Sequence, residues 1–165
     1  MPNRSVPRDG MAAGIALAAM LLGLWLPSKL VVSTSPSLDH RVFLRLDLAM
    51  EREKDRGEYL IFHYQDSDHI HQGLHQDNDL LIKQVGCRPG ERLLVGDGRA
   101  SCQGISLGTQ LETDGQGRAL RHFTYDGIVP PGKYFMIGNH ERSYDSRYFG
   151  FIDASQFRQR ALPLW

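Results

Sequence analysis

The sequence feature that most constrains the fold is an apolar stretch that carries one lysine. Residues 80–86 read Leu-Leu-Ile-Lys-Gln-Val-Gly, and the turn-forming residues Arg88-Pro89-Gly90 follow closely. This pattern predicts a short strand that ends in a tight turn. A buried ammonium is costly unless it is paired or loses its proton, and burial can lower a lysine pKa by about 3–5 units. Lys83 is therefore a candidate general base; the alternative is a lysine that points to solvent from a half-buried strand.

An uncharged segment near the N-terminus predicts a membrane anchor. Residues 10–28 hold 19 residues without a charge, and Arg4 and Arg8 precede them. A run of about 20 apolar residues can span a bilayer, and the arginines favour a cytoplasmic position for residues 1–9. Residues 29–165 would then form a periplasmic domain in a Gram-negative bacterium. A cleavable signal peptide is the alternative, because Ser33-Thr34-Ser35 offers a small-x-small site, but Pro36 would follow the cut and disfavours it.

The remaining chain predicts one mainly β domain. It has roughly 135 residues, enough for a single core, and the 17 glycines and 8 prolines of the whole chain favour a turn-rich structure. Strands are expected at 41–48, 58–64, 80–86, 92–102 (a hairpin), 133–138 and 148–152. Residues 103–121 are expected to be a polar connector. Zero net charge at pH 7 gives no reason to expect a nucleic-acid partner.

Two other groups of residues leave alternatives open. Cys87 and Cys102, 15 residues apart, are the only cysteines. They suit either one disulfide or two buried thiols, and an oxidising compartment would favour a disulfide worth about 3 kcal/mol. The histidines at 63, 69, 71 and 75 lie in or beside a polar stretch. Because no cysteine or well-placed glutamate completes a zinc pattern, a solvated loop is expected there instead of a metal site.

Three motifs together resemble the boxes of bacterial type I signal peptidases, peptidase family S26. Residues 129–152 read VPPGKYFMIGNHERSYDSRYFGFI, residues 82–91 read IKQVGCRPGE, and residues 35–38 read SPSL. They occur in the family's order, after the expected membrane span. The compact chain, its single span and Phe43 after the serine box resemble the TraF-type branch found in conjugative transfer systems.

The resemblance implies a Ser/Lys dyad on a mainly antiparallel β fold. Ser37 would be the nucleophile and Lys83 the base that takes its proton, a known variant of the catalytic triad. The backbone N–H of Ser37 and the hydroxyl of Ser35 would form the oxyanion hole. No metal and no cofactor are implied.

The same resemblance assigns three residues of the last motif. Ser143 would orient the Lys83 amine, and Asp145 and Arg147 would form a structural ion pair beside the site. The alternative for residues 139–147, without a catalytic role, is an exposed hairpin loop with one ion pair.

Several positions depart from the family's usual residues. Asn139 stands in place of an aspartate, Asp39 in place of the proline usual in the transfer branch, and Gln84 and Glu91 in place of arginine and aspartate. None of these removes the dyad. Asp39 would place a charge near the nucleophile unless Arg41 pairs with it.

These features predict a membrane-anchored serine endopeptidase that removes signal sequences from exported precursors, with a propilin as the expected substrate in conjugation. The expected partners are that precursor and the lipid bilayer of the inner membrane. One alternative is a pilin cyclase, in which the same acyl-enzyme is attacked by an amine instead of water. Another is an inactive structural component of the transfer apparatus.

Overall fold

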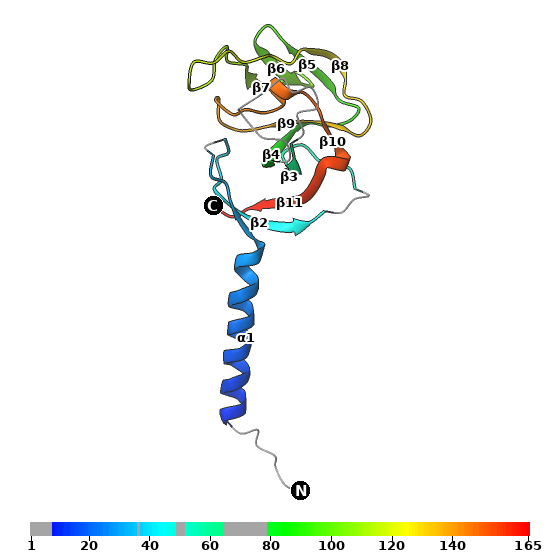
Figure 1. Ribbon diagram of the computed structural model, residues 1–165. Helices are drawn as coiled ribbons and strands as arrows, with labels where there is room; N and C mark the ends of the chain where they lie inside the picture. Colours follow the sequence, from blue (N-terminus) through cyan, green and yellow to red (C-terminus); the bar gives the residue numbers. More distant parts are fainter. Residues whose placement is uncertain (1–7, 36, 49–51, 65–78) are drawn as a thin grey trace.

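The computed structural model describes residues 8–35, 37–48, 52–64 and 79–165. The chain begins with a long helix, α1 (Arg8–Lys29), that stands away from the β domain (Figure 1). Its described apolar side chains, such as Ile15, Met20 and Trp25, are more than half exposed. Within the described residues, no helix meets the length and apolarity needed to cross a membrane.

The β domain contains two antiparallel sheets, as the sequence predicted for the class of fold. The larger sheet has seven strands in the order β1-β2-β11-β3-β4-β9-β10, and the smaller has four in the order β7-β6-β5-β8. The strands of the larger sheet are β1 (Leu30–Val32), β2 (Val42–Asp47), β3 (Tyr59–His63), β4 (Leu80–Cys87), β9 (Lys133–Ile137), β10 (Ile152–Asp153) and β11 (Phe157–Pro163). Those of the smaller sheet are β5 (Arg92–Gly96), β6 (Arg99–Cys102), β7 (Ile105–Thr109) and β8 (Tyr125–Ile128).

The strand with the lysine lies inside the larger sheet. β4 pairs with β3 on one side and β9 on the other. Leu60 of β3, which is fully buried, lies directly opposite Lys83. A central strand with partners on both sides is what the nearly continuous apolar run of residues 80–86 predicts.

Two local predictions are wrong. Residues 148–152 do not form a strand, because Ser146–Phe149 make one helical turn, α2, and only Ile152–Asp153 pair with β9. The Asp145 side chain accepts a hydrogen bond from the Arg147 N–H and caps this turn, and Gly150 ends it with a φ of 81°. Helix capping therefore outweighs the β propensity of the aromatic residues.

The expected connector at 103–121 is also partly ordered into β7. Its residues Ile105–Thr109 pair with β6, with a register shift between Ala100 and Ser101. Gly108 and the bulge interrupt the alternation of apolar and polar residues that would have revealed the strand. The remaining helical segment is the short 3-10 helix η1 (Ala154–Gln156).

Candidate active site

The serine motif lies in the loop between β1 and β2. The Ser33 N–H donates to the Arg41 carbonyl at 2.8 Å and closes this loop. Leu38 is 5% exposed and packs into a core cluster with Phe43 and Ile61. The Oγ atoms of Ser35 and Ser37 are 2.8 Å apart, within hydrogen-bond distance. Leu38 therefore anchors the loop in the core, and the two hydroxyls lie just before it in the sequence.

Lys83 is buried inside the protein, so the alternative of a solvent-facing lysine is wrong. Its side chain is 3% exposed, and Nζ donates to the Ser143 Oγ at 2.9 Å. Burial lowers the pKa of Lys83 from 10.5 to about 8, while the charge of Asp145 raises it and that of Arg147 lowers it further. A lysine with this pKa becomes increasingly neutral as the pH rises toward and above 8, and the neutral amine can accept a proton.

The two serines and the lysine line one pocket. Its volume is about 290 Å³, and Ser35, Ser37 and Lys83 are among its lining residues. Apolar side chains from β1, β3 and β4 form much of the rest, including Val31, Ile61 and Leu81. Residues that are more than 40 positions apart in sequence thus face the same space.

Gly138, directly after β9, lies between the serine loop and Ser143. A Cβ at this position would come within 2.6 Å of both the Ser37 carbonyl oxygen and the Ser143 Cβ. Only glycine fits so close an approach of main chain and side chain. The next residues continue the contact, since the His140 N–H donates to the Ser37 carbonyl at 3.3 Å.

Asp145 and Arg147 form a buried ion pair, so the part of the segment that holds the pair is not exposed, whereas residues 139–142 are. The side chains of Asp145 and Arg147 are 0% and 2% exposed, and two guanidinium nitrogens of Arg147 donate to the carboxylate at 2.8 and 2.9 Å. The same carboxylate accepts the Gly138 N–H at 2.8 Å. Burial lowers the pKa of Arg147, but the hydrogen bond and charge of Asp145 more than offset this, so its pKa is raised.

Comparison with known proteins identifies the family to which this geometry belongs. The family model described as "Signal peptidase, peptidase S26" matches residues 8–165. The chain belongs to the signal peptidase family, peptidase S26. The resemblance seen in its three motifs is thereby confirmed at the level of the family.

The relatives of this S26 family member include conjugal transfer proteins. It is 41% identical over 87 residues to the conjugal transfer protein TraF of Agrobacterium fabrum (strain C58 / ATCC 33970), a match that covers 52% of this chain and 48% of the relative. It is 46% identical over 39 residues to signal peptidase I of Buchnera aphidicola subsp. Acyrthosiphon pisum (strain APS), covering 23% of this chain and 12% of the relative. The chain therefore spans about half the length, or less, of these curated relatives.

A solved structure with a partly similar arrangement is that of a signal peptidase I from Enterococcus faecalis V583. The two share 23% sequence identity, with a TM-score of 0.41, and the match covers 66% of this chain and 97% of the other.

Sequence reasoning missed the contribution of β7 to this S26 site. The Arg147 Nη1 donates to the Thr109 carbonyl at 2.8 Å, and the buried Gln110 side chain donates to the Arg147 carbonyl at 2.6 Å. Gly108 allows this approach, because a Cβ there would lie 2.8 Å from Arg147 Nη1. The one signal available was a Gly-Thr-Gln sequence in a stretch without periodicity, which does not point to a buried arginine.

The two cysteines form a disulfide, as one of the two alternatives predicted. Cys87 and Cys102 are joined, with their Cα atoms 5.7 Å apart, and connect the end of β4 to the end of β6. Together with Glu91 they are the one group of potential metal ligands found among the described residues. Sulfur atoms committed to a disulfide are not thiolate ligands, so we assign no metal to this group. The histidines at 69, 71 and 75 lie outside the described residues.

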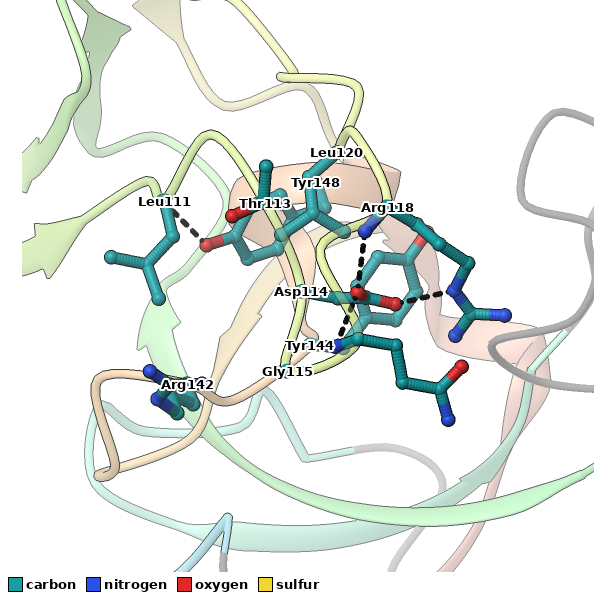
Figure 2. Close-up of a pocket in the computed structure, with 10 residues that line it drawn as sticks. Leu111, Thr113, Asp114, Gly115, Arg118, Leu120, Arg142, Tyr144 and Tyr148 are labelled. Atoms are coloured by element: carbon teal, nitrogen blue, oxygen red, sulfur yellow. Dashed lines mark hydrogen bonds and ion pairs between the residues drawn. The ribbon is translucent and has the colours of Figure 1, made fainter.

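A second pocket lies between residues 111–120 and residues 142–148 (Figure 2). It has a volume of about 280 Å³ and is lined by Tyr144 and Tyr148, whose rings stack with centroids 5.4 Å apart. The Asp114 carboxylate accepts the N–H groups of Gln116 and Arg118 at 2.8 and 2.9 Å and shapes the turn that forms one wall (Figure 2). Among the described residues that line it, none is a predicted site residue.

Proposed function

We propose that this S26 family member is a serine endopeptidase that removes signal sequences from exported precursors, with Ser37 as nucleophile and Lys83 as general base. The observation that carries the proposal is the shared pocket: Ser37 and Lys83 both line it, and Lys83 is almost fully buried. A serine hydroxyl is a weak nucleophile until a base takes its proton. A lysine whose pKa is lowered to about 8 can serve as that base.

The proposed reaction begins when Ser37 Oγ attacks the carbonyl carbon of the scissile peptide bond. Lys83 accepts the hydroxyl proton and later gives it to the departing amine, which leaves an acyl-enzyme. Water then attacks the ester, with Lys83 again accepting a proton, and the serine is regenerated. The hydrogen bond from Lys83 Nζ to Ser143 Oγ supports this role, because it fixes one N–H of the amine and so orients its lone pair.

We assign the stabilisation of the oxyanion to the Ser37 N–H and the Ser35 hydroxyl. Ser35 Oγ lies 2.8 Å from Ser37 Oγ, so it is close to the atom at which the tetrahedral intermediate would form. Loss of one such donor typically costs about 10²–10³ in rate. A Ser35→Ala variant should therefore show a reduced rate with little change in folding, since Ser35 is exposed.

We further propose that α1 holds the domain at the inner membrane with the active site in the periplasm. Its 22 residues would extend about 33 Å, and its described apolar side chains are exposed with no covering from the sheets. The disulfide suits an oxidising compartment. Protease digestion of spheroplasts tests this: the β domain should be degraded while intact cells protect it, and recovery of the protein in the soluble fraction would contradict the anchor.

Mass spectrometry of a propilin co-expressed with the protein tests the proposed reaction. The wild-type protein should shorten the precursor, whereas Ser37→Ala and Lys83→Ala should leave it intact. Ser155→Ala, a change of an exposed serine in η1, is the matched control and should process normally.

The product mass separates the remaining alternatives. A linear product indicates hydrolysis, and a product lighter by one water indicates cyclisation through the same acyl-enzyme. Equal processing with wild type and Ser37→Ala would show that Ser37 is not the nucleophile and would favour a structural role in the transfer apparatus.

A further inference from the structure

The serine loop is tied to the residues after β9 by two side chains with no assigned role. Asn139 Nδ2 donates to Asp39 Oδ2 at 2.7 Å, across 100 positions of sequence. Asp39 follows Ser37 by two residues, and Asn139 directly follows Gly138. We propose that Asp39 and Asn139 form a latch that positions Ser37 relative to Lys83. The inference rests on the proposed role of Ser37 as nucleophile.

The latch lies close to the point where the serine loop meets the segment that carries Ser143, the partner of Lys83. Gly138 separates the Ser37 carbonyl from the Ser143 side chain, and Ser143 is the hydrogen-bond partner of Lys83. The neighbouring backbone bond from His140 N–H to the Ser37 carbonyl is long, at 3.3 Å. The charge-assisted hydrogen bond between Asp39 and Asn139 lies two residues after Ser37 and one residue before His140. It is stronger and sets the distance between these segments.

Tyr59 connects the latch to β3, the strand that pairs with β4, on which Lys83 lies. It is 7% exposed, and its side chain shares a hydrogen bond with Asn139. Tyr59 lies on β3 opposite Gln84, and its neighbour Leu60 lies opposite Lys83. Asn139 thus joins the serine loop to a strand that is in register with Lys83.

Residues 39 and 139 can form the hydrogen bond only if one of them donates and the other accepts. A carboxylate at 39 only accepts hydrogen bonds, so position 139 must donate, and an asparagine does. Aspartate at 139 would place two carboxylates against each other, which repel unless one is protonated. The reverse arrangement, asparagine at 39 and aspartate at 139, restores one donor and one acceptor.

A reciprocal swap tests the latch in the full-length protein. Asn139→Asp should lower kcat for propilin processing by about tenfold, the equivalent of one lost charge-assisted hydrogen bond, with KM little changed. Asp39→Asn should have a smaller effect, because two asparagines can still form a hydrogen bond. The double variant D39N/N139D should recover to within about threefold of wild type.

Two further measurements keep the test decisive. Asp126→Asn removes an exposed carboxylate, the partner of Arg92 in the smaller sheet, and should leave kcat unchanged. Hydrogen exchange of the His140 amide, which donates to the Ser37 carbonyl, should accelerate in Asn139→Asp and return toward wild type in the double variant.

The outcomes distinguish the latch from the proposed function. A wild-type protein that processes no precursor overturns the proposed function, while the exchange rates still show whether the two side chains hold the loop. Normal kcat and normal His140 exchange in Asn139→Asp would overturn the latch. So would a double variant no better than Asn139→Asp, because the two side chains would then not act as a pair.

Discussion

Two buried cationic side chains, Lys83 and Arg147, both donate a hydrogen bond to Ser143, but their other surroundings differ. Lys83 and Arg147 are 3% and 2% exposed. Lys83 donates to a neutral hydroxyl, that of Ser143, whereas Arg147 faces the Asp145 carboxylate through two nitrogens and also donates to the Thr109 carbonyl. Burial lowers the pKa of both groups, but the hydrogen bond and charge of Asp145 reverse the direction only for Arg147, so the pKa of Lys83 is lowered and that of Arg147 is raised.

This difference shows that a carboxylate partner can reverse the effect that burial has on the pKa of a cation. A charge with a carboxylate and several carbonyls around it remains a charge and holds the structure together. A charge that meets only a hydroxyl loses its proton more readily and becomes available for chemistry. Arg147 also assists Lys83 directly, since its positive charge lowers the lysine pKa.

The largest expected effect comes from removing the titrating cation. Lys83→Met should reduce precursor processing by at least about 10³-fold, because the proposed base is lost. The thermal midpoint should stay the same or rise, since a buried amine that is hydrogen-bonded to a hydroxyl instead of a carboxylate is replaced by an apolar side chain of similar length. Processing at more than a tenth of the wild-type rate would contradict the assignment of Lys83.

Breaking the buried ion pair of Asp145 and Arg147 should instead lower the stability of the protein. Asp145→Asn leaves the buried Arg147 without its counter-charge and should lower the free energy of unfolding by about 3–5 kcal/mol. The same substitution at Asp126 breaks an exposed pair with Arg92 and should cost less than about 1 kcal/mol. Urea denaturation of both variants measures the contrast, and equal losses would mean that burial of the pair does not matter.

Two buried serines, Ser143 in the loop before α2 and Ser146 at the start of α2, extend the comparison. Ser143 accepts from Lys83, whereas Ser146 accepts the Met136 N–H at 2.8 Å. Ser143→Ala should lower kcat by about 10²-fold, because the amine is no longer oriented. Ser146→Ala should leave kcat unchanged and cost about 1–3 kcal/mol in stability, since it orphans a buried donor. Kinetics and unfolding on both variants test this, and a rate loss shared by both would indicate general loosening of the loop.

Much of the site could be predicted from the local sequence, because its candidate catalytic residues lie in short motifs. The apolar run around Lys83 predicts a buried strand, and a buried lysine needs a special partner. Ser37 and Ser143 came from motif resemblance, and the structure places Ser37 in the Lys83 pocket and Ser143 at hydrogen-bond distance from Lys83.

What could not be predicted depends on contacts between distant segments. The bond between Asp39 and Asn139 spans 100 positions, and the sequence suggested only Arg41 as a residue that could pair with Asp39. The contacts of Thr109 and Gln110 with Arg147 required the topology that brings β7 to the site. The helical turn α2 was hidden because its aromatic residues favour a strand, while the capping by Asp145 depends on a side-chain geometry that residue type alone does not fix.

The smallest expected effect is the pH dependence of precursor processing, which separates Lys83 from Arg147. Below about pH 8 Lys83 is protonated in the folded protein and cannot accept the serine proton. Processing should therefore rise as pH increases through about 8 and level off above it, a change of roughly tenfold between pH 7 and pH 9. Arg147 should not titrate in this range, because its pKa is raised.

Since the charge of Asp145 raises the pKa of Lys83, Asp145→Asn, measured well below its unfolding temperature, should shift the midpoint of the kcat/KM profile to lower pH. A shift to higher pH would show that loss of the carboxylate changes the burial of the lysine more than its electrostatic surroundings.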